Sequence, residues 1–226
     1  MIKDNFNKYL LEVENKVNNT LKNTPTQRKL FKQGYSFSNT NSFEQLKIWD
    51  YIWNNSSDYW IKIQSFLFCE SQIKNKDFLI YSWKTIKHWQ KQVDNWGHCD
   101  ALSKICTKIL ELIPEEVLEQ LKLWNKSENP WDKRQSLVSL LYFSRTKKII
   151  LPFETIIYFI NRLLVDKEYY VQKAVGWSLK ELYNVYPKET LIYLEENIKN
   201  ISSIAFSPAT EKLKKHEKEK LKKLRK

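Results

Sequence analysis

The stretch YYVQKAVGWSLKELY, residues 169–183, repeats its apolar residues with the period of an α-helix. The positions that form one stripe are Val171, Val175, Leu179 and Leu182. At 100° per residue, Trp177 lies away from this stripe, and Lys173 and Lys180 both lie within about 60° of Trp177. The pattern therefore predicts a helix with one buried face and one aromatic, basic face.

Helical spacing continues on both sides of this stretch. Val117, Leu121 and Trp124 form one stripe, and Ile156, Ile160 and Leu163 form another. Residues 42–53 and 58–70 are predicted to form a further helix pair. Each proline is expected at or near the start of a helix, where its missing N–H costs little. These prolines are Pro25, Pro114, Pro130, Pro152, Pro187 and Pro208.

Helix pairs of about 35 to 45 residues, without a competing strand pattern, predict an all-α fold of ten to twelve helices. We expect an α-α superhelix of HEAT-like repeats, a solenoid with a concave face, as a single domain over residues 1–210. Residues 211–226 are expected to form a basic C-terminal extension. From Lys212 onward, nine Lys and Arg residues stand against Glu217 and Glu219, which is about +7 of the net charge of +12.

The positive charge indicates a polyanionic partner, either nucleic acid or an anionic membrane surface. No apolar run approaches the ~18 residues of a membrane span, and the N-terminus is too polar for a signal peptide. Cys69, Cys99 and Cys106 are expected to be reduced thiols in a cytoplasmic protein. His98 with Cys99 and Cys106 lacks a clear fourth ligand, so no metal or other cofactor is predicted.

Three segments carry residues that packing alone does not explain. In the first, Trp177 between Lys173 and Lys180 is either a contact with a neighbouring repeat or a platform for a nucleic acid, with lysines for phosphates. In the second, DNWGHCDALSKICTKILELI, Asp100 points away from the apolar stripe and lies four residues after Trp96.

Asp100 admits two interpretations. It is either the N-cap of a helix that starts at Ala101, with Gly97 a potential break upstream, or a carboxylate that faces a groove beside the Trp96 indole.

In the third segment, NPWDKRQSLVSLL, Asn129 is a predicted N-cap and Pro130 the first helical residue. Lys133 and Arg134 have the wrong sign for this end of the helix dipole. A bound phosphate would resolve the conflict, and Lys133 and Arg134 would then form one anion site. The alternative is a solvated surface.

Together these segments resemble the AlkD-like family of DNA alkylation repair glycosylases, which are built from HEAT-like repeats. The run DKEYYVQKAVGWSLKELYNVYP is similar to the family's C-terminal element and places its tryptophan at Trp177. The family's Trp-x-x-x-Asp element falls on Trp96 and Asp100, and its Trp followed by basic residues falls on Trp131 and Arg134. Gly97, His98 and Cys99 stand where many members have a second tryptophan and an extra acid.

The resemblance implies a monofunctional DNA N-glycosylase that releases cationic N3- and N7-alkylated purines from duplex DNA in base excision repair. Asp100 would be the catalytic carboxylate, and Trp96 and Trp177 would pack around the lesion. The implied DNA-binding residues are Arg134, Lys133, Lys173 and Lys180. We expect a monomer in the cytoplasm, in part associated with the nucleoid, with no membrane contact. The alternatives are a non-catalytic solenoid for damaged or branched DNA, and a HEAT scaffold for protein partners.

Overall fold

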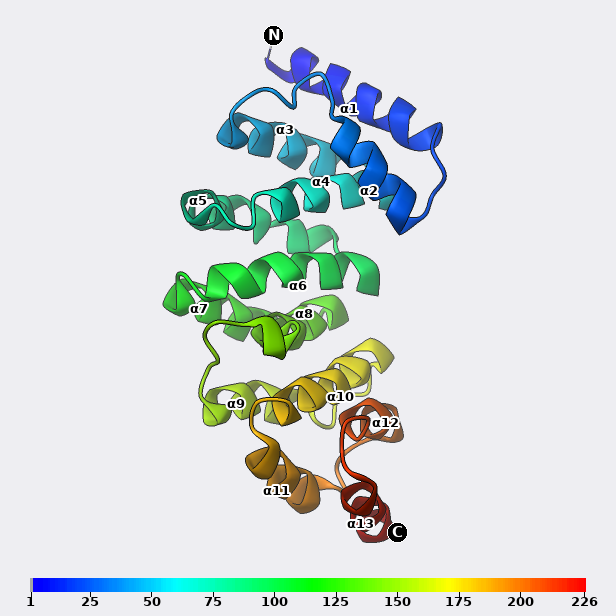
Figure 1. Cartoon of the computed structure of the whole chain (residues 1–226), viewed down its shortest axis with the longest axis vertical. Helices are drawn as coiled ribbons and strands as arrows, with labels where there is room; N and C mark the ends of the chain where they lie inside the picture. The colour runs from blue at the N-terminus through cyan, green and yellow to red at the C-terminus, as the bar shows by residue number, and fades with distance from the viewer. Residues whose placement is uncertain (1) are drawn as a thin grey trace. The chain divides into compact units, whose positions relative to one another are not determined.

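The chain is all-helical in the computed structural model, which describes residues 2–226, and side chains from Phe6 onward (Figure 1). These residues form thirteen α-helices and two short 3₁₀ helices, with no β-strand among them. The predicted fold class is therefore confirmed. The chain divides into two compact units, Met1–Ile105 and Cys106–Lys226, whose boundary lies inside helix α6.

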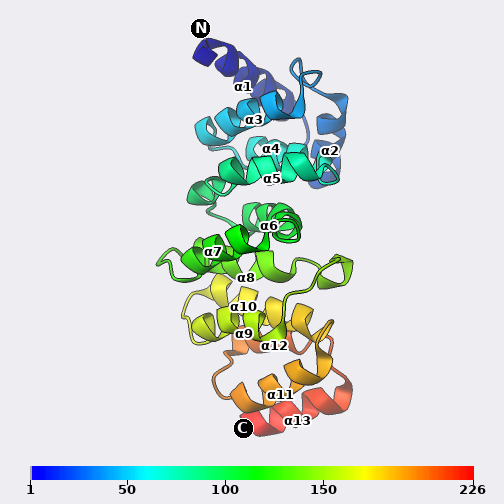
Figure 2. The same ribbon diagram turned by 90° about the vertical axis from the view of Figure 1, so that its left-hand side faces the viewer.

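In unit 1, α3 packs against α1, α4 and α5, and α4 packs against α2 (Figures 1 and 2). The predicted helix pair is present as α3 and α4. The core is strongly aromatic, because Trp49, Trp53 and Trp89 are all fully buried. The elements are α1 (Ile2–Asn18), α2 (Thr24–Gln33), α3 (Ser42–Asn55), α4 (Tyr59–Ser71), α5 (Lys76–Ile86), the 3₁₀ helix η1 (Trp89–Gln92) and α6 (Trp96–Leu110).

In unit 2, α10 is the central helix and packs against α8, α9, α11 and α12. Its predicted stripe is confirmed: Val171, Val175, Leu179 and Leu182 are fully buried. The elements are α7 (Pro114–Asn125), α8 (Pro130–Leu141), the 3₁₀ helix η2 (Ser144–Thr146), α9 (Phe153–Leu163), α10 (Tyr169–Tyr183), α11 (Pro187–Asn197), α12 (Ser203–Ala209) and α13 (Lys215–Arg225).

The expected position of Pro208 is wrong. Pro208 lies inside α12, near its end, and does not precede a helix. α12 runs so close to α10 that a Cβ at Gly176 would stand 2.5 Å from Pro208 Cγ and 2.3 Å from the carbonyl oxygen of Ala205. Only a glycine at position 176 leaves room for this approach.

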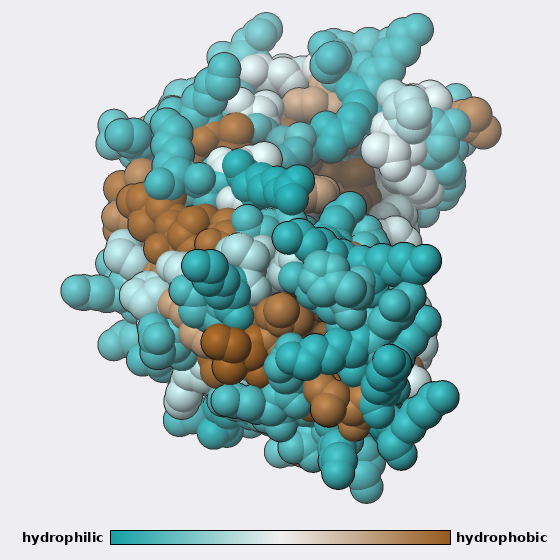
Figure 3. Space-filling view, turned by 60° about the horizontal axis from the view of Figure 1, so that its bottom comes forward, coloured by the Kyte–Doolittle hydropathy of each residue, from teal (hydrophilic) through white to brown (hydrophobic). Residues whose placement is uncertain are grey.

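The basic C-terminal segment forms helix α13, which packs in unit 2. Leu221 is fully buried, and Tyr183 donates its hydroxyl proton to Glu217 at 2.9 Å. The guanidinium of Arg225 lies over the ring of Phe206 at 4.6 Å. Figure 3 shows a face on which hydrophilic side chains predominate and hydrophobic ones gather in small areas. Among the described residues, no helix combines the length and the apolar character that a membrane span requires.

Candidate nucleic-acid interface

Helix α6 begins at Trp96, five residues earlier than the alternative in which Asp100 is an N-cap. Asn95 performs the capping role, because its side-chain oxygen accepts a hydrogen bond from the backbone N–H of His98 at 2.8 Å. Gly97 does not interrupt the helix. The N-cap interpretation of Asp100 is therefore wrong, since the residue lies within the second turn. Asp100 and Trp96 share one side of α6, with Trp96 57% exposed and Asp100 half-buried.

Tyr59, the first residue of α4, covers α6 at Gly97. A Cβ at Gly97 would stand 2.4 Å from the Tyr59 hydroxyl and 3.1 Å from two of its ring carbons. Asp58 caps α4, accepting hydrogen bonds from the backbone of Trp60 at 2.7 Å and of Ile61 at 3.1 Å. The glycine in the Trp-x-x-x-Asp element thus admits an aromatic ring from another helix, which the sequence did not reveal.

His98 is a buried structural residue beneath Tyr59. The two rings stack with centroids 4.6 Å apart and an interplanar angle of 13°. Asn95 donates to His98 Nδ1 at 2.8 Å, so Nε2 carries the proton and donates to the backbone oxygen of Tyr59 at 3.2 Å. Burial lowers the pKa of His98 to about 4, so the imidazole is neutral at physiological pH.

A cleft of about 360 Å³ opens beside these residues, lined by Tyr59, Asp94, Asn95, Trp96 and Gly97. Two of its walls are exposed aromatic side chains, and the Asp94 carboxylate is also exposed. Burial, and then the negative charge of Asp100, raises the pKa of Tyr59. The phenol therefore lies within the field of Asp100. Aromatic faces and carboxylates together favour a positively charged ligand.

A basic cluster lies in the same unit, one turn further along α6. Lys104 and Arg28 both bind the carboxylate of Glu70, Arg28 through two hydrogen bonds of 3.1 and 3.0 Å. Burial alone would raise the pKa of Glu70, but the hydrogen bonds from Arg28 and Lys104 outweigh it and lower the pKa. Because two cations surround one carboxylate, the cluster of Arg28, Lys104 and Glu70 has a net positive charge.

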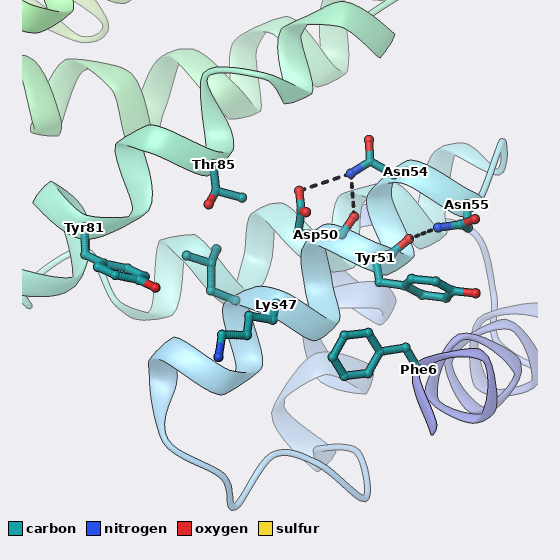
Figure 4. A pocket seen from close by; sticks show the side chains of 9 residues that line it. Phe6, Lys47, Asp50, Tyr51, Asn54, Asn55, Tyr81 and Thr85 are labelled. Atoms are coloured by element: carbon teal, nitrogen blue, oxygen red, sulfur yellow. Dashed lines mark hydrogen bonds between the residues drawn. The ribbon is translucent and has the colours of Figure 1, made fainter. Parts of the chain in front are cut away.

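A second cavity of about 360 Å³ lies between α1, α3 and α5 and contains none of the predicted site residues (Figure 4). Several of its polar groups have partners within the protein: Asp50 accepts from Asn54 at 3.1 Å and from the indole of the neighbouring Trp89 at 2.7 Å. Lys47 is paired with Glu44 at 2.8 Å. Asp50, Asn54 and Lys47 are thus engaged within the protein, and none of the predicted site residues line this cavity, so it is not the candidate site.

In unit 2, α10 presents a face of aromatic and basic residues. Tyr170, Lys173, Trp177 and Lys180 fall within an arc of about 80° at 100° per residue. Tyr170 and Lys173 are exposed, whereas Trp177 and Lys180 are half-buried. The neighbouring Gly176 faces α12 at a close helix–helix contact. Trp177, the next residue, lies on the outer face of α10.

Two aromatic contacts extend this face beyond α10. Trp131 of α8 lies against Tyr170, with ring centroids 5.0 Å apart. Tyr142, directly after α8, lies against Trp177 with centroids 6.0 Å apart. Lys180 forms an ion pair with Glu211 at 3.4 Å, so part of its charge is compensated within the protein. Trp177 therefore has both a packing contact and accessible surface.

The start of α8 differs from the predicted anion site. The cap is as expected, because Asn129 accepts from the backbone of Trp131 at 2.9 Å and Pro130 opens the helix. Lys133, however, forms an ion pair with Asp166 at 2.9 Å, so a protein carboxylate balances its charge there. Arg134 is only 8% exposed and donates from Nη1 to the backbone oxygen of Tyr170 at 3.2 Å. Phosphate binding by Lys133 and Arg134 stays a prediction.

The three cysteines are buried and form no disulfide, and the described side chains contain no group of three or more His, Cys, Asp or Glu placed to hold a metal ion. The fold and these exposed aromatic, basic and acidic side chains define a protein of helical repeats with a candidate nucleic-acid interface.

The family model for the DNA alkylation repair enzyme matches residues 20–213. The chain therefore belongs to the DNA alkylation repair enzyme family, and the resemblance to AlkD-like proteins is confirmed.

Solved structures show the same fold. A predicted DNA alkylation repair enzyme from Enterococcus faecalis has a TM-score of 0.68 at 20% identity, over 84% of this chain and 86% of that one. AlkD2 from Streptococcus mutans has a TM-score of 0.59 at 18% identity, and smu.31 from Streptococcus mutans UA159 has 0.55 at 18%, each over 97% of both chains. Among curated proteins, none matches the chain.

Proposed function

We propose that the protein is a monofunctional DNA glycosylase that hydrolyses the N-glycosidic bond of cationic N3- and N7-alkylated purines in duplex DNA. The observation that carries this proposal is the placement of Trp96 and Asp100 one helical turn apart on α6, with Trp96 lining a cleft together with Tyr59 and with the charge of Asp100 acting on the Tyr59 phenol. The cleft combines the aromatic side chains of Tyr59 and Trp96 with the carboxylate of Asp94, which suits a cationic nucleotide. Membership of the family supports DNA repair as the context.

In the proposed reaction, the bond between the sugar C1′ and the base nitrogen breaks and its electron pair leaves with the base. A cationic base departs as a neutral molecule, so it is already a good leaving group. The carboxylate of Asp100 stabilises the positive charge that develops on the deoxyribose and orients a water molecule toward C1′. Water adds its hydroxyl to C1′ and releases a proton, which leaves an abasic site.

For DNA binding, the proposal uses aromatic and basic groups of unit 2. In unit 2, Lys173 and Lys180 are proposed to contact phosphates, and Trp177 offers an aromatic surface for a sugar or base. Because Arg134 is buried, we propose that it acts mainly by holding the first turn of α10 through its bond to the Tyr170 carbonyl. The protein is proposed to act as a monomer.

The decisive experiment compares the wild type with Asp100→Asn in single-turnover release of 7-methylguanine and 3-methyladenine from alkylated duplex DNA. Loss of the charge should reduce the rate on the order of 10²- to 10³-fold. DNA affinity and the melting temperature serve as controls. Wild-type rates in Asp100→Asn would remove this residue from the mechanism.

A second candidate function is DNA binding without catalysis. It is favoured by the net charge of +12 and by the aromatic and basic face of α10, neither of which requires chemistry. Tight binding to damaged duplex with no base release by the wild type would support this alternative.

A further inference from the structure

The segment between α8 and α9 contains an unusual backbone conformation at an exposed aromatic residue. Phe143 has φ +48°, and among the described residues it is the one non-glycine residue with a positive φ. This region disfavours residues with a bulky side chain, so the conformation costs free energy that contacts elsewhere must supply. Its side chain is nevertheless 56% exposed, so burial of the ring does not compensate for the strain.

Buried polar groups hold this segment at its start. Glu181 of α10 is buried and accepts two hydrogen bonds from Ser144, from the backbone N–H and from the hydroxyl, both at 2.8 Å. The backbone oxygen of Glu181 lies 2.9 Å from the same hydroxyl and shares its single proton with the carboxylate. These contacts fix the residue that follows Phe143, and thereby the direction of the Phe143 side chain.

The far end of the segment is held in the same way. Lys147 buries its side chain and donates to Thr107 Oγ1 at 2.7 Å, with Glu111 at 3.8 Å. Burial lowers the pKa of Lys147 to about 8. The backbone N–H of Lys148 donates to Glu111 at 3.3 Å. The segment is thus attached to α10 at Ser144, to α6 at Lys147 and to Glu111 at Lys148, with the exposed Arg145 between these attachments, which makes it a preorganised surface.

The aromatic and basic groups around Phe143 are of the kinds that bind a nucleic acid. Its ring contacts Tyr142 at 4.8 Å, and Tyr142 in turn contacts Trp177 on the outer face of α10. Arg145 and Lys148 are exposed, and residues 142–152 contain no acidic residue. The segment therefore extends the aromatic and basic face of α10. An exposed aromatic ring in the same segment as exposed cations is an arrangement by which proteins stack against unstacked bases and hold the flanking phosphates.

We propose that the segment Tyr142–Lys148 is an additional DNA contact, in which Phe143 stacks against an unstacked base of the duplex and Arg145 and Lys148 hold neighbouring phosphates. This inference rests on the DNA binding of the proposed function, and it does not require base release. Glu181 and Lys147 are positioning residues, because they present Phe143 without contacting the DNA.

The test uses the full-length protein and a duplex with 2-aminopurine beside a tetrahydrofuran abasic site, because 2-aminopurine fluorescence rises when the base unstacks. In Phe143→Asn, the ring is removed and the left-handed conformation is retained at lower cost. We expect an unchanged or higher melting temperature, loss of the fluorescence rise, and affinity weakened on the order of 10-fold. The salt dependence should stay as in the wild type, because no phosphate contact is lost.

Ile149→Asn is the matched control, since Ile149 is an exposed apolar residue that directly follows this segment. It should leave the affinity and the fluorescence within about twofold of the wild type. A twofold change in affinity corresponds to only ~0.4 kcal/mol of binding free energy. Phe143→Gly provides a second variant that accepts the same backbone conformation.

Wild-type fluorescence and affinity in Phe143→Asn, an equal loss in Ile149→Asn, or failure of both Phe143 variants to fold would overturn the inference. Base release is measured separately on methylated duplex. A wild type that binds DNA but releases no base would refute the glycosylase and leave this inference standing. A wild type that binds no duplex would overturn both.

Discussion

Substitution of Gly97 by alanine tests the central packing feature of the candidate site. The new Cβ would stand 2.4 Å from the Tyr59 hydroxyl and 3.1 Å from two of its ring carbons, closer than non-bonded atoms approach. The ring cannot simply retreat, because it stacks on His98 at 4.6 Å and meets the edge of Trp60 at 4.9 Å. Either Tyr59 leaves its place or α4 and α6 move apart.

The magnitude follows from two opposing effects. Alanine in place of glycine favours a helix by roughly 0.5–1 kcal/mol. Overpacking of a filled site costs roughly 1–3 kcal/mol. Gly97→Ala should therefore range from nearly neutral to about 2.5 kcal/mol destabilising. In a Tyr59→Ala background the clash is absent, so the same change should stabilise the protein by up to about 1 kcal/mol.

The assay is a double-mutant cycle by urea unfolding on the wild type, Gly97→Ala, Tyr59→Ala and the double variant. The structure predicts a coupling free energy of roughly 1–3 kcal/mol. Single-turnover base release on the same four proteins shows whether the position of Tyr59 affects the reaction. Additivity within about 0.5 kcal/mol would refute the packing of Tyr59 on Gly97, and with it the cleft.

Three further predictions follow from the same contacts. First, burial holds the pKa of His98 at about 4, below the 6.5 of the unfolded chain. Between these two pH values the unfolded state binds more protons than the folded state. The free energy of unfolding should therefore fall by up to roughly 3 kcal/mol as the pH drops from 6.5 to 4. Urea midpoints at each pH should lose most of this slope in His98→Gln, and an unchanged slope would contradict the assignment. Second, Lys173→Ala should weaken binding to damaged and undamaged duplex alike and reduce the salt slope by about 1, as titrations at several salt concentrations would show; an effect confined to damaged duplex would speak against a phosphate contact. Third, truncation from Lys212 should lower both the salt slope and the melting temperature, because the segment is basic and Leu221 is fully buried, yet single-turnover release at saturating enzyme should persist if the tail is outside the site. Abolished release in a truncated protein that remains folded would place the tail within the site.

Local patterns were sufficient to predict the helices and their buried faces. The stripe of α10 follows from the 3.6-residue period, which depends only on the chain's own geometry. The outer face with Lys173 and Trp177 follows from the same period. Asn129 and Pro130 mark the start of α8 because capping is a local interaction. The start of α6 was missed, because Asn95 was not recognised as the cap and Asp100 offered a second acceptable one.

Contacts between helices could not be predicted in this way, because they depend on how distant segments align in space. The period of α8 does not reveal that Asp166 balances Lys133, or that Arg134 is buried beneath the Tyr170 carbonyl. The sequence by itself therefore determined the all-helical fold and the side of α6 that carries Trp96 and Asp100. Only the tertiary structure decided that Tyr59 completes that side, because the space above Gly97 exists only once α4 has packed against α6.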